Sequence, residues 1–189
     1  RELTELSEKL SAVPVAMTFH PHPRELLHPR TVPPLLIPPQ ERIVMLHQFG
    51  AKAVVTIPFT KQFAALSPTE FLDSCLSAEN VRLSGVCVGS EWRFGAKGMG
   101  NSQLLAEEAA KRGFVSSAVD ELVVDGTTVS STAVRSAILH GELQKAARML
   151  GRRYTLFGMI RSGYGVAGGK LNHPTANLEI SYGIVPPNG

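Results

Sequence analysis

The feature that most constrains the fold is a repeated alternation of short apolar runs with stretches of helical periodicity. Each apolar run is shorter than an ordinary helix and is bounded by turn residues, a pattern typical of buried strands. Runs of this kind occur at Val13–Phe19, Ala53–Phe59, Leu83–Gly89 and Val115–Val124. Strands that alternate with helices form parallel sheets with helices on both faces. We therefore predict an α/β fold built on a parallel sheet covered by helices.

Capping residues set the expected bounds of the helices. Ser67, Pro68 and Glu70 combine a capping box with a proline at the first helical position, ahead of an apolar run. Asn101 suits the start of a helix and Gly113 its end. Further helices are expected over residues 3–10, 40–49 and 132–140 and in the segment that ends at Gly151, followed by a strand over Tyr154–Ile160.

The composition fits a globular chain: 43% of the 189 residues are hydrophobic and 19% are charged. No run approaches the roughly 18–20 apolar residues of a transmembrane helix, and the first residues lack the apolar region of a secretory signal. We therefore expect a soluble, cytoplasmic protein. The net charge is +3, but the basic residues are scattered, which favours nucleotides over long nucleic acids as partners. Cys75 and Cys87 lack the spacing of a zinc site or a disulfide framework and are expected to be reduced core residues.

A loop rich in proline and histidine follows the first expected strand. Its sequence is TFHPHP over residues 18–23, and open α/β sheets bind ligands at the carboxyl ends of their strands. Pro21, His22 and Pro23 could form a rigid wall for a planar ligand or a phosphate. The alternative is a proline-stiffened connection with solvated histidines. A metal site from His20, His22 and His28 is less favoured, because no carboxylate lies at ligand spacing.

A second motif, GSEWRFG over residues 89–95, follows the third expected strand. Its two glycines would let the backbone approach a bound base. A structural loop anchored by Trp92 and Phe94 explains the same residues equally well.

A third motif, SSTAVR over residues 130–135, places hydroxyl groups at a helix start and an arginine one turn later. Such a helix start can hold a phosphate group. The alternative is a plain N-cap followed by a surface arginine.

The character of the chain changes after residue 150. Gly168, Gly169 and Lys170 precede PTAN at residues 174–177, and together they could surround phosphates with oxygen ligands for Mg²⁺. This is not a Walker A sequence. Residues 151–189 are too few to form an ordinary domain alone, so we expect a truncated second domain.

The order of the four motifs, from about Val13 to Gly189, resembles the bacterial bifunctional riboflavin kinase/FMN adenylyltransferase family. The less specific segments Phe63–Ser67 and Leu150–Arg152 agree with it. The resemblance implies a nucleotidyltransferase-like (Rossmann-like) domain over residues 1–150 that adenylylates FMN to FAD with release of pyrophosphate. It implies the start of a β-barrel riboflavin kinase domain, which makes FMN from riboflavin, over residues 151–189.

The resemblance also implies site residues. Near the flavin and the nucleotide it places Pro21, His22, Pro23, Gly89, Glu91, Arg93, Phe94 and Gly95. At the ATP phosphates during adenylyl transfer it places Ser130, Ser131, Thr132 and Arg135. ATP in the kinase part would be bound by Gly168, Gly169, Pro174, Thr175 and Asn177, of which Thr175 and Asn177 would also bind Mg²⁺. The implied small molecules are ATP, riboflavin, FMN and FAD, no nucleic acid or membrane partner is implied, and a homo-oligomer stays open.

The sequence departs from the family pattern at several points. Residues 1–12 contain neither the family's first strand nor its His-x-Gly-His motif, and the barrel strands with the catalytic glutamate are absent. We therefore expect both active sites to be incomplete in these 189 residues, which alone could be inactive. Glu91 stands where Asp or Asn is usual, and Asn172 and His173 replace a glycine and an aromatic or aliphatic residue.

Two alternatives stay open at this point. The first is another nucleotidyltransferase of the same fold, one that acts on nicotinamide or pantetheine nucleotides; PTAN in a second domain argues against it. The second is a flavin- or nucleotide-binding relative without catalytic activity.

Overall fold

The structure is a computed structural model that describes residues 1–76, 81–162 and 176–188. The chain divides into two compact units. Unit 1 comprises Arg1–Val32 and Ile43–Leu122, and unit 2 comprises Pro33–Arg42 and Val123–Gly189. The chain thus leaves unit 1 after Val32, returns to it at Ile43, and leaves it again after Leu122.

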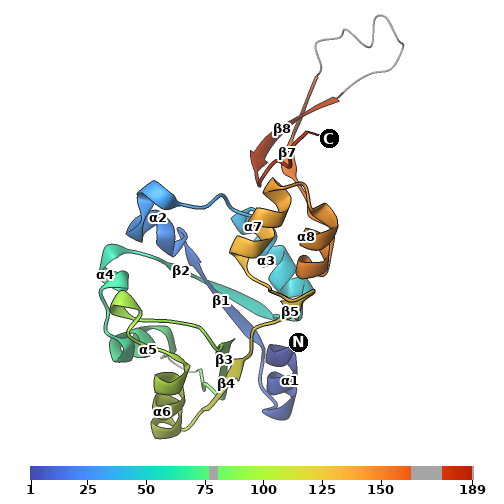
Figure 1. Ribbon diagram of the computed structural model, residues 1–189. Coiled ribbons are helices and arrows are strands. Elements are labelled where there is room, and N and C mark those ends of the chain that lie inside the picture. Colours follow the sequence, from blue (N-terminus) through green and yellow to red (C-terminus); the bar gives the residue numbers. More distant parts are fainter. Residues whose placement is uncertain (77–80, 163–175, 189) are drawn as a thin grey trace, which may run out of the picture. The chain divides into compact units, whose positions relative to one another are not determined.

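Unit 1 contains two pairs of parallel strands (Figure 1). β1 (Val15–His20) pairs with β2 (Ala53–Pro58), and β3 (Gly85–Gly89) pairs with β4 (Val115–Val119). The predicted parallel pairing is confirmed. The single continuous sheet is not seen among the described strands, which form two separate ladders. In each ladder, the chain passes from the first strand to the second through a crossover that contains a helix. This helix is α3 (Pro39–Gln48) in the first pair and α6 (Ser102–Arg112) in the second.

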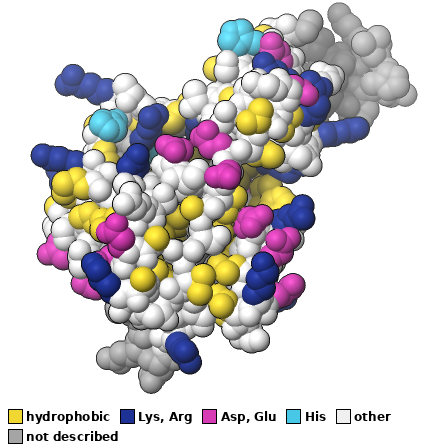
Figure 2. All heavy atoms as spheres, turned by 60° about the horizontal axis from the view of Figure 1, so that its bottom comes forward, with side chains coloured by type: hydrophobic (Ala, Val, Ile, Leu, Met, Phe, Trp, Pro, Cys, Tyr) yellow, Lys and Arg dark blue, Asp and Glu magenta, His cyan; other side chains and the backbone are white. Residues whose placement is uncertain are grey.

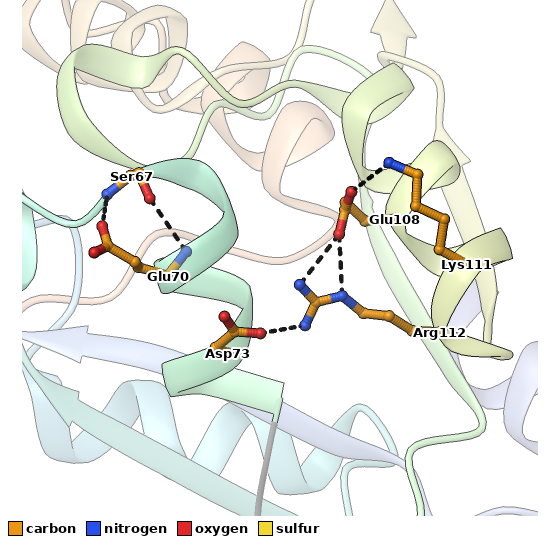
Figure 3. Close-up of polar contacts among 6 residues, drawn as sticks. All are labelled: Ser67, Glu70, Asp73, Glu108, Lys111 and Arg112. Carbon is orange, nitrogen blue, oxygen red and sulfur yellow. Dashed lines mark hydrogen bonds and ion pairs between the residues drawn. The ribbon is translucent and has the colours of Figure 1, made fainter.

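Local capping chemistry explains the helix bounds of unit 1. Ser67 and Glu70 form the predicted capping box at α5 (Pro68–Leu76), with hydrogen bonds of 2.8 and 3.3 Å between side chain and backbone (Figure 3). Asn101 accepts a 2.8 Å bond from the Leu104 N–H at the start of α6, which ends at a left-handed Gly113. The remaining helical elements are α1 (Glu2–Lys9), α2 (Pro23–Leu27), η1 (Pro29–Thr31), α4 (Lys61–Ala64) and η2 (Ala96–Gly98).

Aromatic rings dominate the core of unit 1. The ring of Phe71 lies 5.4 to 6.4 Å from those of Phe19, Phe63, Trp92 and Phe94. Leu72 of α5 and Leu105 of α6 are 1% exposed and complete the centre of the core, together with Ala109 and Phe114. This packing joins β1, α5, α6 and the loop after β3, so their relative positions are fixed by burial of large side chains.

A charged network ties α5 to α6 outside this core (Figure 3). Arg112 contacts Asp73 of α5 and Glu108 of its own helix, and Lys111 donates a 2.8 Å bond to Glu108. The hydrogen bonds from Lys111 and Arg112 hold the pKa of Glu108 below its usual range. Since Asp73 is more than half exposed, the ion pair between Arg112 and Asp73 adds little to stability by itself, and its main effect is on the alignment of α5 and α6.

Unit 2 is built around two adjacent helices, α7 (Ser131–Leu139) and α8 (Leu143–Leu150) (Figure 1). Its fully buried centre contains Ile138 and Ala146, each 0% exposed. A short antiparallel ladder, β5 (Val123–Val124) with β6 (Thr127–Thr128), precedes α7.

The C-terminal hairpin pairs β7 (Phe157–Ser162) with β8 (Ala176–Tyr182) in antiparallel orientation. The prediction of a strand from Tyr154 is wrong by three residues at its start. The reason is that Tyr154 has another partner: its hydroxyl oxygen accepts a 2.6 Å bond from the Ile184 N–H, and Ile184 is buried in the core of unit 2. The described part of the hairpin is a two-stranded sheet, and the predicted barrel stays a prediction.

Candidate functional site

The first predicted motif lies directly after β1, and its histidine has a defined local role. His22 is the N-cap of α2: its Nδ1 accepts a 3.1 Å bond from the Arg24 N–H, and its own N–H donates a 2.9 Å bond to Glu25. Pro23 is the first residue of the helix, and the His20–Pro21 peptide bond is cis. The two hydrogen bonds and the proline at the first helical position restrict this loop locally.

The second motif, residues 89–95, is anchored from within. Trp92 and Phe94 stack at 4.6 Å between ring centres, and Phe94 is only 4% exposed. Gly95 adopts a φ of 71°, and a Cβ there would lie 2.7 Å from the backbone of Pro68. The stacking of the two rings and the burial of Phe94 support the alternative of a structural loop for these two aromatic residues.

The charged residues of this motif differ from the rings beside them. Glu91 and Arg93 are exposed, and they alternate with the two anchoring rings. The loop therefore presents one carboxylate and one guanidinium group outward on a rigid base.

Gly89 stands apart from the other described glycines. A Cβ at Gly89 would meet nothing within 4 Å, and its φ lies outside the left-handed range that favours glycine. Each other described glycine either has a positive φ or would press a Cβ against a neighbour, as Gly85, Gly100 and Gly158 do. The fold itself gives no reason for a glycine at position 89, at the carboxyl end of β3. Open space beside a bare backbone is what a closely approaching ligand needs.

A cavity of about 490 Å³ lies elsewhere in unit 1. It is lined by Leu76, Arg82, Leu83, Arg112, Gly113 and Phe114. These residues precede β3 and β4, so the cavity is at the amino ends of both strands, away from Gly89. Ligands of open α/β sheets bind at the carboxyl ends, and Arg112 is already bound to two carboxylates. We therefore do not assign this cavity to the predicted site.

The third motif begins α7 in unit 2. Ser130 is its N-cap and accepts a 3.1 Å bond from the Ala133 N–H, which confirms the predicted cap. Ser131 and Thr132 occupy the first exposed turn. One turn later, the Nε–H of Arg135 donates a 2.9 Å bond to the carbonyl oxygen of Pro34. The sequence gives no sign of this partner, since the two residues are 101 positions apart.

Because each of the three motifs follows an expected strand or begins a helix, the sequence also predicts that they face one common cleft, and this stays a prediction. The first two motifs belong to unit 1 and the third to unit 2. Of the kinase residues, Gly168, Gly169, Pro174 and Thr175 lie outside the described residues, and Asn177 is a member of β8, opposite Arg161.

Three properties of the described residues bear on the chemistry of the site: the distribution of charge, the metal-ligating side chains and the state of the thiols. Lys and Arg side chains are spread singly over the face shown in Figure 2, among acidic ones. Within the described residues, no group of three or more His, Cys, Asp or Glu side chains could hold a metal. Burial raises the pKa of Cys75 to about 11 and also raises that of Cys87, so neither thiol is activated as a nucleophile.

Comparison with known proteins identifies the family. The family model described as FAD synthetase matches residues 1–133. The chain belongs to the FAD synthetase family. That match covers the first two motifs and the start of the third, so the resemblance found in the sequence is confirmed at the level of the family.

The curated relatives carry both activities in their names. Proteins named bifunctional riboflavin kinase/FMN adenylyltransferase are 30% identical in Bacillus subtilis over 98% of this chain and 58% of theirs, and 28% identical in Buchnera aphidicola over 99% and 60%. The Escherichia coli K12 protein of the same name is 29% identical over 99% of this chain. The chain thus spans about 60% of the length of these relatives.

A solved structure shares the fold of this chain. It is titled a macrolide-efflux protein from Streptococcus pneumoniae, with a TM-score of 0.82 and 26% identity over 98% of this chain and 60% of that one. In the part of the chain that the structure describes, no helix has the length and apolar character needed to span a membrane.

Proposed function

We propose that the protein containing this chain makes FAD from FMN and ATP, and FMN from riboflavin and ATP. The observation that carries the proposal is the FAD synthetase match over residues 1–133, which takes in the loops after β1 and β3. The names of the curated relatives support both reactions.

In the proposed adenylyl transfer, a phosphate oxygen of FMN attacks the α-phosphorus of ATP. The bond between that phosphorus and the bridging oxygen breaks, and pyrophosphate leaves with the electron pair. Negative charge on the phosphates increases along this path, so fixed donors that face it lower the barrier. We assign this role to Arg135 and to the first turn of α7, with Ser130, Ser131 and Thr132, where the helix start favours anions. Mg²⁺, when bound, would supply further neutralisation at the phosphates.

The flavin and nucleotide side of the site is assigned to unit 1. Pro21, His22 and Pro23 would form a stiff wall after β1, and the bare backbone of Gly89 would leave room for a flat ring after β3. Glu91 and Arg93 would contact the ligand directly, because both side chains are exposed. Phe94 and Gly95 would act indirectly, by fixing the loop that carries these two residues.

The kinase reaction is assigned to the C-terminal segment. Gly168 and Gly169 would approach the ATP phosphates, and Thr175 and Asn177 of the PTAN sequence would contact Mg²⁺–ATP. In this proposal 1–150 is the adenylyltransferase domain and 151–189 is the beginning of the barrel. The partners are the small-molecule substrates, in the cytoplasm, with no nucleic acid.

Replacement of Arg135 by alanine in the complete protein tests the adenylyl-transfer assignment. The rate of FMN adenylylation should fall about 100-fold, as for loss of a single donor to developing phosphate charge, while riboflavin phosphorylation changes little. The two activities are measured separately, by chromatography of FAD and of FMN. Equal loss of both would mean that Arg135 supports folding or a step common to both reactions.

A further inference from the structure

The guanidinium group of Arg135 is held by a segment that is remote in sequence. Its Nε–H donates to the carbonyl oxygen of Pro34 at 2.9 Å. Pro34 belongs to the stretch Pro33–Arg42, which joins unit 2 although the residues on either side of it belong to unit 1. The sequence motif at residues 130–135 gives no indication of this contact.

The backbone around the acceptor is restricted, although Pro34 itself is exposed. Proline fixes φ at residues 33 and 34, and it also restricts the residue that precedes it. Two positions after Pro34, the side chain of Leu36 packs into the core of unit 2, and Pro38 is buried. The Pro34 carbonyl therefore has little freedom to follow a moving side chain.

The donor stands on the same core. Arg135 lies on α7 next to Val134, which is 2% exposed, and one turn before Ile138, which is 0% exposed. Leu36 packs against the cluster that contains both of these side chains. Helix and acceptor loop are thus positioned by one set of buried contacts.

A guanidinium group is planar and has five N–H donors, of which Nε carries one. A bond at Nε therefore restricts the orientation of the whole plane, including the terminal nitrogens. We infer that the Pro34 carbonyl, anchored by Leu36, is a positioning element that orients Arg135 toward the triphosphate of ATP. This inference rests on the proposed adenylyl transfer, and it makes Leu36 a positioning residue that acts through Arg135.

A double-mutant cycle in the complete protein tests the inference. Leu36→Ala should lower the kcat of FMN adenylylation about tenfold with little change in the KM for FMN, since a misplacement below 1 Å at a catalytic group costs up to about 100-fold. In the Arg135→Ala background the same substitution should change kcat less than about twofold, because the group that it positions is gone.

Leu150→Ala is the matched control. Leu150 packs against the same core from α8 and has no place in the loop that carries Pro34. Any loss that it causes should be of equal factor in the parent protein and in the Arg135→Ala background. Circular dichroism and thermal unfolding establish that each variant is folded, and Leu36→Val replaces Leu36→Ala if the latter does not fold.

The outcomes distinguish failure of the inference from failure of the proposed function on which it rests. If Arg135→Ala leaves adenylylation unchanged, the proposed role of Arg135 is wrong and the inference is wrong with it. If Arg135→Ala lowers the rate but the Leu36 substitution costs the same factor in both backgrounds, the positioning role is overturned and the proposed function stands.

Discussion

Substitution of Gly89 by alanine should separate folding from activity. A Cβ at this position would meet no atom of the protein within 4 Å, and the backbone is not in the left-handed region. The added methyl group therefore costs nothing in packing, while it removes conformational freedom from the unfolded chain. Glycine-to-alanine changes at such compatible positions stabilise a protein by about 0.4–1 kcal/mol. For a chain of this length, we expect the midpoint of thermal unfolding to rise by about 1–4 °C.

The effect on activity should have the opposite sign. If the flavin or the adenine lies against the backbone of Gly89, a methyl group must displace it by an appreciable fraction of an ångström or more, and a shift of about 1 Å costs about 100-fold in rate. The assay is kcat/KM for FMN adenylylation in the complete protein, together with thermal unfolding of the same sample.

Gly100→Ala provides the contrast. A Cβ at Gly100 would lie 2.7 Å from the ring of Phe94, so this variant should lose about 1–3 kcal/mol through overpacking. The same chemical change is thus expected to stabilise at position 89 and to destabilise at position 100. A Gly89→Ala protein that keeps kcat/KM within twofold of the parent would refute the argument that a ligand approaches this backbone.

Three further predictions concern other parts of the chain. Glu108 has a lowered pKa in the folded state because of two cationic neighbours on α6, so its stabilising effect is present above about pH 4.5 and is lost as the pH falls through the lowered pKa. Glu108→Gln should therefore reduce the drop in melting temperature between about pH 5 and 3. An unchanged drop would contradict the assignment. In a Cys87→Ser variant, the Cys75 thiol, with a pKa of about 11, should be alkylated by iodoacetamide at pH 8 far more slowly than the free amino acid cysteine. Alkylation at the rate of free cysteine, measured by mass spectrometry, would disprove the burial argument. Replacement of Thr175 and Asn177 by alanine in the complete protein should abolish riboflavin phosphorylation and leave the conversion of FMN to FAD measurable, so loss of both activities would count against two separate sites.

The sequence predicted the elements whose signal is local. β1, β2 and β3 and the helices α5, α6 and α7 lie within a few residues of their expected bounds, because strand-like apolar runs and capping side chains depend only on near neighbours. The five-residue α2 and the four-residue α4 were not predicted, since helices of one turn show no periodicity.

The long-range features could not be read from the sequence. The contact between Pro34 and Arg135 and the grouping of Pro33–Arg42 with unit 2 join residues that no periodicity connects. Phe94 shows a second kind of ambiguity. An aromatic residue in a loop after a strand can stack on a ligand or anchor the loop, and only its 4% exposure shows that it anchors. For Gly89 the sequence indicated the position, whereas the open space around it emerged only from the structure.

The path of the chain between the two units limits how the gene can be divided. A fragment that starts at Val123 would contain α7, α8 and the C-terminal hairpin, but it would lack Leu36, whose side chain packs into their core, and the Pro34 carbonyl that accepts from Arg135. Its apolar core would be open where Leu36 belongs, and such a fragment is expected to aggregate rather than to fold. Separation of the two units would require residues 33–42 to be grafted onto the second fragment. The two units therefore cannot be obtained by a single cut in the chain, despite their separate cores.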